Sequence, residues 1–441
     1  MDRTLIIRAL GLYLPTVLAA ALVWQKVRTH RLVAALLAGL CWSLCSLLLL
    51  QILNQQFLWW RFHAVGGLLR GMPVDLYLGW ALLWGVLPIL IMPRASIWIA
   101  LGLFLALDLA MMPACAPVVE LSRTWLVGEV VALVLVLLPA VLFSRWTMNG
   151  TQLGFRSLLW AITASSLLLF FVPEIFFALS KRGGWQALLN TSGSVRNLYF
   201  QLIFLLAVPA FSAVQEFARR GHGTPIPYDP PQRLVASGMY RYLANPMQTS
   251  GVLVFTAWAL LLRNPWLVMA GFTIVIYCVG LAAWHEGEDM KDRLGKPWLR
   301  YRANVANWIP RWRPWHDPET ALPCLYIAEG CGQCSEVRRW LEARHPIALK
   351  IVAAEDHPTR NLYRMTYDPM DDTSPEEGAA AFARGLEHLN LAWAFVGSLL
   401  RLPVIRPLAQ LLLDASGLGP QLIERRSCAG LNRAWQRGSD R

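Results

Sequence analysis

Long apolar runs recur from the N-terminus to about residue 285, and they constrain the fold more than any other feature of the chain. A helix that crosses a bilayer needs about 20 mostly apolar residues, although several of these runs are shorter. The sequence therefore predicts a polytopic α-helical membrane protein. We expect about nine transmembrane helices, at Leu5–Trp24, Leu32–Leu53, Leu76–Met92, Ile97–Met112, Trp125–Phe143, Leu158–Leu179, Leu198–Val214, Met247–Leu262 and Trp266–Trp284.

The composition agrees with a chain that lies largely in a membrane. Hydrophobic residues make up 56% of it and charged residues only 15%, against roughly 25% charged residues in typical soluble domains. This balance excludes a wholly soluble protein and a disordered one. Basic loops on the cytoplasmic side of a membrane explain the net charge of +12. Since no aromatic-basic platform accompanies that charge, we expect no nucleic-acid partner.

The distribution of basic residues predicts an orientation. With nine spans, the loops after the odd-numbered spans hold Lys26, Arg28, Arg31, Arg94, Arg145, Arg219, Arg220, Arg233 and Arg241. The opposite loops hold Arg61, Arg70, Lys181, Arg182, Arg196 and Arg263. Because basic residues collect on the cytoplasmic side, we expect an outside N-terminus and a cytoplasmic C-terminus, in the inner membrane of a bacterium.

From Glu286 onward charges become dense, and no later run is long and apolar enough to span a bilayer. Ala394–Leu413 comes closest, but two arginines and two prolines interrupt it. Three regions are therefore expected: membrane helices of unassigned role over residues 1–217, a second membrane region with a basic, Trp-rich tail over 218–315, and a small soluble domain over 322–430.

Acidic residues inside or beside the apolar runs are a further feature of the N-terminal region. An acid within a membrane usually faces a cavity or a partner; alternatively, it lies at a helix end and contacts water, Lys or Arg. The second explanation is better for Asp75 and Glu120, and it is harder to apply to Glu129 and Glu174. The set comprises Asp75, Asp108, Glu120, Glu129 and Glu174.

The second membrane region carries an ordered series of motifs. A Pro-rich loop over residues 224–231 precedes Tyr240-Arg241 and Asn245-Pro246, and a helical hairpin follows, broken at Arg263-Asn264-Pro265. Its second arm ends near Glu286, and Gly295, Tyr301-Arg302 and Trp308-Ile309-Pro310 come next. This order resembles the isoprenylcysteine carboxyl methyltransferase and phospholipid methyltransferase superfamily over roughly a fifth of the chain.

The resemblance implies an S-adenosylmethionine-dependent methyltransferase. The cofactor would bind to the last helices and the tail from the cytoplasm, and a lipophilic isoprenoid or lipid-linked acceptor would enter from the bilayer. An acid where a membrane helix meets water, such as Glu286, suits a cationic sulfonium; alternatively, it is merely solvated, and Asn-Pro is a common start of a helix. Matching positions give as cofactor-binding residues Tyr240, Arg241, Asn245, Pro246, Glu286, Tyr301 and Arg302.

The sequence departs from the superfamily pattern at several positions. Ala244 stands where many bacterial members have Arg, and Gln248 replaces a Tyr. Leu294 and Trp298 replace a Phe and a Tyr in the second motif. A changed substrate and a methyltransferase fold without activity both remain open.

A CxxC motif distinguishes the soluble domain. Residues 324–334 predict a strand, a tight turn and the start of a helix over Ser335–Arg344, with Cys331 and Cys334 at the turn. A helix N-terminus favours a nucleophilic thiolate, and the second Cys can resolve a mixed disulfide. A purely structural pair is one alternative. Half of a zinc site is another, but no second CxxC lies nearby, so we expect no metal.

The segment from 324 to 426 resembles the DCC family of predicted thiol-disulfide oxidoreductases. The resemblance rests on the CxxC motif, the 378–382 segment that begins at Gly378, Leu400–Pro403 and Arg425. Glu329 replaces the family's Asp, and one residue is missing before Cys331. It implies a thioredoxin-like fold, catalytic Cys331 and Cys334, and a cytoplasmic thiol reductant as partner.

Together these features favour an integral-membrane methyltransferase with an attached thiol-disulfide redox domain. The alternative is a membrane-anchored thiol-disulfide oxidoreductase in which the methyltransferase-like fold is an inactive scaffold. A reductase resembling the membrane sterol reductases is less favoured, because their Asn-Tyr-rich nicotinamide motif is not evident.

Overall fold

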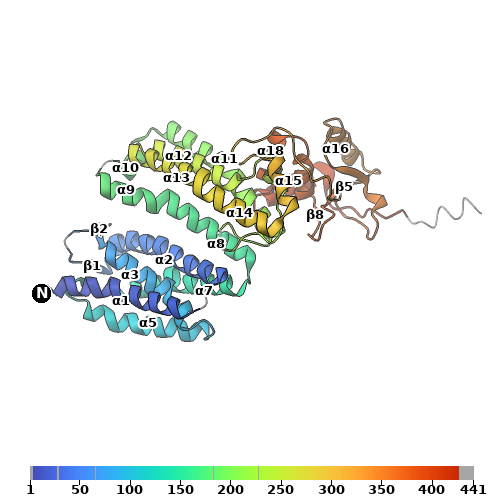
Figure 1. The fold of residues 1–441 in the computed structure, drawn as a ribbon. Coiled ribbons are helices and arrows are strands. Elements are labelled where there is room, and N and C mark those ends of the chain that lie inside the picture. Colours follow the sequence, from blue (N-terminus) through green and yellow to red (C-terminus); the bar gives the residue numbers. More distant parts are fainter. Residues whose placement is uncertain (1–2, 27–28, 65, 182, 227, 427–441) are drawn as a thin grey trace, which may run out of the picture. The chain divides into compact units, whose positions relative to one another are not determined.

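The computed structural model describes residues 3–26, 29–64, 66–181, 183–226 and 228–426, with the backbone alone at 281–286. The chain forms two compact units (Figure 1). The first unit comprises Met1–Phe200, His222–Gln232 and Phe255–Ile276. The second unit comprises Gln201–Gly221, Arg233–Val254 and Tyr277–Arg441.

Seven helices in the described residues are long and apolar enough to cross a membrane. All nine predicted spans are largely helical, but the last two, Pro246–Leu261 and Pro265–Gly280, are shorter than the other seven. The apolar run near the C-terminus forms two helices bent by 97° at its Arg- and Pro-containing interruption. The seven long helices are Arg3–Gln25, His30–Phe57, Val74–Ile91, Ile97–Ala114, Trp125–Asn149, Leu153–Ser180 and Gly193–Gly221.

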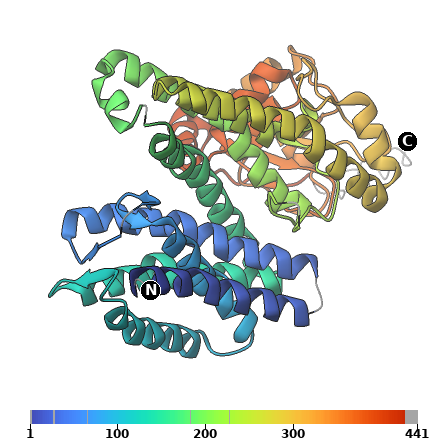
Figure 2. The same ribbon diagram turned by 60° about the vertical axis from the view of Figure 1, so that its left-hand side comes forward.

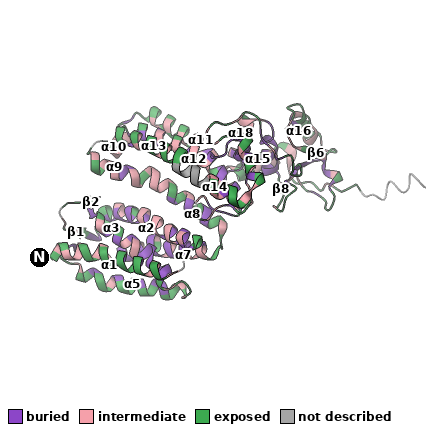
Figure 3. Cartoon of the chain, viewed as in Figure 1, coloured by how far each residue is buried: buried purple, intermediate pink, exposed green. Residues whose placement is uncertain are grey.

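The first unit is a helical bundle whose long helices lie side by side in both views (Figures 1 and 2). Helices α2 and α3 approach so closely at Gly39 and Gly85 that a Cβ on Gly39 would lie 1.9 Å from the Gly85 carbonyl oxygen. Many apolar side chains on α1 and α5 remain exposed (Figure 3), as expected for lipid-facing helices. The main helices are α1 (Arg3–Gln25), α2 (His30–Phe57), α3 (Val74–Gly85), α4 (Leu87–Ile91), α5 (Ile97–Ala114), α6 (Trp125–Ala132), α7 (Leu138–Asn149), α8 (Leu153–Ser166), α9 (Val172–Ser180) and α10 (Trp185–Asn190).

Two short antiparallel ribbons connect helices of the first unit. One pairs β1 (Trp60–Phe62) with β4 (Val119–Leu121), and the other pairs β2 (Leu68–Leu69) with β3 (Met72–Pro73). Arg8 and Asp75 form an ion pair of 2.7 Å, while the largely exposed Glu120 contacts His63 at 3.1 Å. These contacts agree with the interpretation of Asp75 and Glu120 as satisfied acids.

The second unit begins with the C-terminal part of α11 (Gly193–Glu216) and a π-helical turn, Phe217–Gly221. The short 3-10 helix η4 (Gly238–Arg241) precedes α12 (Pro246–Leu261), so Asn245-Pro246 does start a helix. The hairpin's second arm comprises α13 (Pro265–Tyr277), a π-helical segment and α14 (Ala283–Leu294). Residues Phe255–Ile276, which include the end of α12 and nearly all of α13, belong to the first unit. Helix α15 (Lys296–Asn304) follows after Gly295, whose φ of +58° favours glycine.

A four-stranded mixed sheet forms the centre of the C-terminal part. Its order is β6-β5-β7-β8, with β5 and β6 parallel and the other two pairs antiparallel. Helix α16 connects the parallel strands, as the βα pattern around the CxxC motif predicted. The elements are β5 (Cys324–Ile327), α16 (Gly332–Glu342), β6 (Lys350–Ala353), β7 (Thr366–Asp368), β8 (Glu376–Glu377), α17 (Ala379–Leu386), α18 (Leu391–Leu400) and α19 (Ile405–Leu413).

Candidate active site

The two halves of the methyltransferase-like motif meet in the second unit. The Tyr301 hydroxyl on α15 donates to the backbone oxygen of Tyr240, at 2.8 Å. The Trp315 N–H donates to the Arg241 oxygen at 3.0 Å. The Ala244 N–H donates to the Ala306 oxygen at 2.9 Å. These bonds fix the tail after α15 against η4.

Aromatic packing surrounds the same hydrogen bonds. The Tyr301 ring lies edge-on to Trp315, with centroids 5.3 Å apart, and 5.9 Å from Trp298. Tyr240 stacks on Phe217 of the preceding helix, at 5.5 Å. Trp298, which replaces a family Tyr, is therefore part of the buried cluster, and this cluster excludes water from the motif.

Arg241 is the residue of the motif whose side chain has the fewest hydrogen-bond partners for its donors. It is only 6% exposed, and its Nε and Nη1 have no hydrogen-bond partner in the part of the chain that the structure describes. A buried cation without an acceptor is unfavourable. An anionic group of a ligand would therefore fit this position.

The other predicted cofactor residues have different surroundings. Asn245 is buried, and its Nδ2 donates to Gln248 Oε1 at 3.3 Å. Arg302 donates to the Val305 carbonyl oxygen at 2.6 Å and lies 5.8 Å from the Trp298 ring centre. Arg302 therefore binds the end of its own helix. Pro246 opens α12, and the side chain of Glu286 lies outside the described residues.

The C-terminal part packs directly on this motif. Tyr242 donates through its hydroxyl to the Glu387 carbonyl oxygen at 2.9 Å, and Met239 and Tyr242 form a buried cluster with Ala394 of α18. Burial, and after it the positive charge of Arg241, holds the pKa of His388 well below its usual range. Arg241 thus acts electrostatically on a side chain of the C-terminal part.

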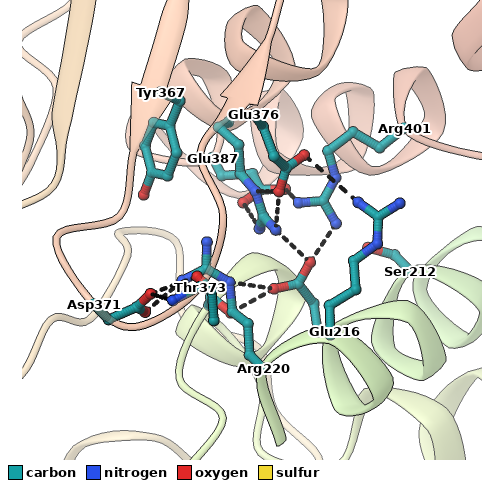
Figure 4. Close-up of polar contacts among 12 residues, drawn as sticks. Ser212, Glu216, Arg220, Tyr367, Asp371, Thr373, Glu376, Glu387 and Arg401 are labelled. Atoms are coloured by element: carbon teal, nitrogen blue, oxygen red, sulfur yellow. Dashed lines mark hydrogen bonds and ion pairs between the residues drawn. The ribbon is translucent and has the colours of Figure 1, made fainter. Parts of the chain in front are cut away.

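A buried ionic network, absent from the sequence-based expectations, joins α11 to the C-terminal part (Figure 4). Glu216 is fully buried and pairs with Arg384, at 2.8 Å, and with Arg401. It also accepts a hydrogen bond from Ser237, which directly precedes η4. Arg220, one helical turn further along, also pairs with Glu216, at 3.4 Å, so the sequence signal is an acid at the end of an apolar helix with a basic residue four positions later. The other two arginine partners lie more than 160 residues away.

The CxxC motif caps a helix, as predicted. Cys331 is the N-cap of α16, and its Sγ accepts the Cys334 N–H at 3.3 Å. The helix therefore begins at Gly332, three residues before the predicted start. The N–H groups of Glu329 and Gly330 donate to the Glu355 carboxylate, at 3.0 and 3.3 Å, and hold the shortened turn.

The two thiols have unequal environments. Burial, and then the neighbouring Cys331, raises the pKa of Cys334 to about 12, so this thiol stays protonated at neutral pH. Both cysteines line a largely apolar cavity of about 70 Å³ together with Val337, Met365 and Phe382. Within the described residues, no group of three or more His, Cys, Asp or Glu side chains is arranged to hold a metal.

Comparison with known proteins finds a family similar to the methyltransferase-like region. No curated protein and no solved structure matches the chain. Residues 200–296, less than a quarter of the chain, match the sequence model of the phospholipid methyltransferase family. The match includes Tyr240, Arg241, Asn245, Pro246 and Glu286, and it ends before Tyr301. This region is thus similar to the phospholipid methyltransferases, in agreement with the order of its motifs.

Proposed function

We propose that this protein is an integral-membrane methyltransferase that uses S-adenosylmethionine and acts on a lipophilic acceptor, an isoprenoid or a lipid-linked molecule. The observation that carries the proposal is the buried, unsatisfied guanidinium of Arg241 within the region that matches phospholipid methyltransferases. The apolar helices support a substrate that arrives from the bilayer.

In this proposal, the motif residues bind the cofactor and orient it. Arg241 would hold the cofactor carboxylate, and the Tyr301–Tyr240 hydrogen bond keeps η4 in place for that contact. Trp298 and Trp315 keep water away. When bound, the cofactor supplies an activated methyl group for in-line transfer, a reaction that depends mainly on positioning and water exclusion.

The C-terminal part, at about 322–430, is proposed to be a thioredoxin-like thiol-disulfide domain on the cytoplasmic side of a bacterial inner membrane. The strand order β6-β5-β7-β8, with the CxxC at the start of the helix after the first strand, supports this proposal. Cys331 would attack a disulfide, Cys334 would resolve the mixed disulfide, and a cytoplasmic thiol would reduce the pair.

One observation favours the alternative, a redox protein on an inactive scaffold. Met239 and Tyr242, which flank Tyr240 and Arg241, pack against α18 of the C-terminal part. The motif therefore provides a surface on which α18 packs. An inactive scaffold would need the motif only for this packing.

Calorimetric titration of the detergent-purified protein with S-adenosylmethionine tests the proposal. We expect Arg241→Ala to weaken binding by roughly 10- to 100-fold, the usual effect of losing a charge-assisted hydrogen bond. Arg311→Ala is the matched control, because Arg311 lies in the same tail and its side chain contacts only the Asn304 carbonyl oxygen, at 3.0 Å, among the described hydrogen bonds. Absence of binding by the unmodified protein would favour the scaffold alternative.

A further inference from the structure

Two acidic side chains lie close together inside the first unit, away from the proposed methyltransferase site. Asp108 of α5 is 2% exposed, and Glu129 of α6 is 3% exposed. The Trp80 Nε1–H of α3 donates to Asp108 Oδ1 at 3.1 Å. Neither acid takes part in the function proposed above.

One carboxyl oxygen of each acid lacks a hydrogen-bond donor, which indicates that one of the two groups carries a proton. Asp108 Oδ2 and Glu129 Oε2 have no hydrogen-bond donor among the described residues, yet the two side chains line the same small cavity. Two ionised carboxylates cannot form a hydrogen bond, because neither is a donor. One proton on either group would satisfy both oxygens.

Among the described residues that line the site with these two acids, none carries a positive charge. The two acids line a cavity of about 20 Å³ with uncharged side chains from α2, α3, α5, α6, β1 and β3, namely Leu47, Leu50, Gln51, Trp60, Phe62, Met72, Trp80, Trp84, Met112 and Ala132. Cys115, just beyond α5, is a further titratable side chain that interacts electrostatically with Asp108, and it carries no positive charge. Two negative charges in such a site would be strongly unfavourable, so one carboxyl must be neutral.

The cavity itself fits one water molecule. The Nε1–H of Trp84, a buried residue that also lines the cavity, has no acceptor in the described structure. Indole N–H groups beside both the acid and the cavity favour a water over a metal ion, which would need several oxygen ligands.

Glu174 is a buried acid of the same unit that does have a cationic partner. It is 6% exposed, and the guanidinium of Arg70 and the indole N–H of Trp185 both contact its Oε1. In the part of the chain that the structure describes, no such cation lines the cavity with Asp108 and Glu129.

We propose that Asp108 and Glu129 form a proton-binding site, in which the pair shares one exchangeable proton beside a single water molecule. A neutral carboxyl next to water inside a helical bundle can both donate and accept a proton. The site is independent of methyl transfer.

Infrared difference spectroscopy on the full-length protein in lipid vesicles tests the proposal. At pH 7 exposed acids, with pKa values of about 4, are ionised. We expect the wild-type spectrum minus that of the D108N/E129Q double variant to show one neutral carboxyl and one carboxylate per chain. Wild type minus Glu174→Gln should show the loss of a carboxylate alone. Two carboxylates and no neutral carboxyl in the first difference would overturn the proposal.

A measurement on the unmodified protein covers the case in which the double variant does not fold. We expect a neutral-carboxyl band to persist at pH 7 and to disappear as the pH is raised while the protein remains folded. A wild-type spectrum without any neutral carboxyl at pH 7 would exclude a shared proton.

Discussion

The burial and the hydrogen-bond partners of single polar side chains are the properties that the sequence predicts least. The motif order predicted Tyr240 and Arg241 as neighbours of the tail, and their backbone bonds to Tyr301 and Trp315 agree. The sequence could not predict that Arg241 lies buried, that its Nε and Nη1 have no acceptor among the described residues, or that its charge lowers the pKa of His388. Those properties depend on segments far apart in the sequence, such as the tail at Trp315 and the C-terminal part at Glu387 and His388.

His388 gives a prediction about acid stability. It is buried, its Nδ1 lies 2.8 Å from the Ile347 carbonyl oxygen, and Tyr367 contacts its Nε2 at 3.1 Å. Because its folded pKa is well below the usual range, only the unfolded chain takes up a proton on this group below about pH 6.5. We therefore expect stability to fall by up to about 1.4 kcal/mol per pH unit below that value.

Thermal melting between pH 7.5 and 5.5 would measure this effect. His388→Asn can keep the bond to Ile347 and should flatten the dependence of the melting temperature on pH. The exposed His345 is the matched control, and His345→Asn should leave the dependence unchanged. An equally steep dependence in His388→Asn would assign the acid sensitivity to other groups.

At the scale of elements, local signals predicted the helices well and their ends less well. Asn245-Pro246 starts α12 as expected. The helix after the CxxC begins at Gly332 because the Cys331 side chain caps it, and simple periodicity does not reveal that cap. The contact of α11 with the C-terminal part was not predictable. Its apolar run ends in a single acid, Glu216, and besides the local Arg220 its arginine partners come from α17 and the end of α18.

Glu216→Gln tests how strongly this contact holds the second unit together. The change would leave Arg384 and Arg401 buried with one fewer carboxylate, and removal of one partner from a buried pair typically costs about 3–5 kcal/mol. We expect the melting temperature to fall by roughly 10 °C.

Glu342→Gln provides the comparison, because Glu342 forms a more exposed ion pair with Arg338 at 2.9 Å. Surface pairs of this kind contribute about 0–1 kcal/mol, so its melting temperature should change little. Similar shifts in the two variants would show that the Glu216 network is no stronger than a surface pair.

At the scale of the whole molecule, composition and packing divide the chain at different places. The fall in apolar content near Glu286 follows the shorter apolar helix Pro265–Gly280, whereas the seven long helices end at Gly221. The compact second unit, however, includes residues 201–221 and 233–254 together with the whole C-terminal part. Only the folded structure reveals this association, since it rests on Glu216, Tyr242 and other buried contacts between distant segments.

This organisation predicts that the methyltransferase-like region depends on the C-terminal part for its fold. A chain that ends at residue 320 would expose Met239 and Tyr242 and would remove both Arg384 and Arg401 from Glu216. We expect it to aggregate in size-exclusion chromatography and to lose S-adenosylmethionine binding. A chain that ends at residue 426 keeps every contact described above and should behave like the full-length protein. A monodisperse 1–320 chain with unchanged cofactor binding would instead mean that the two parts fold independently, with the buried network serving only to join them.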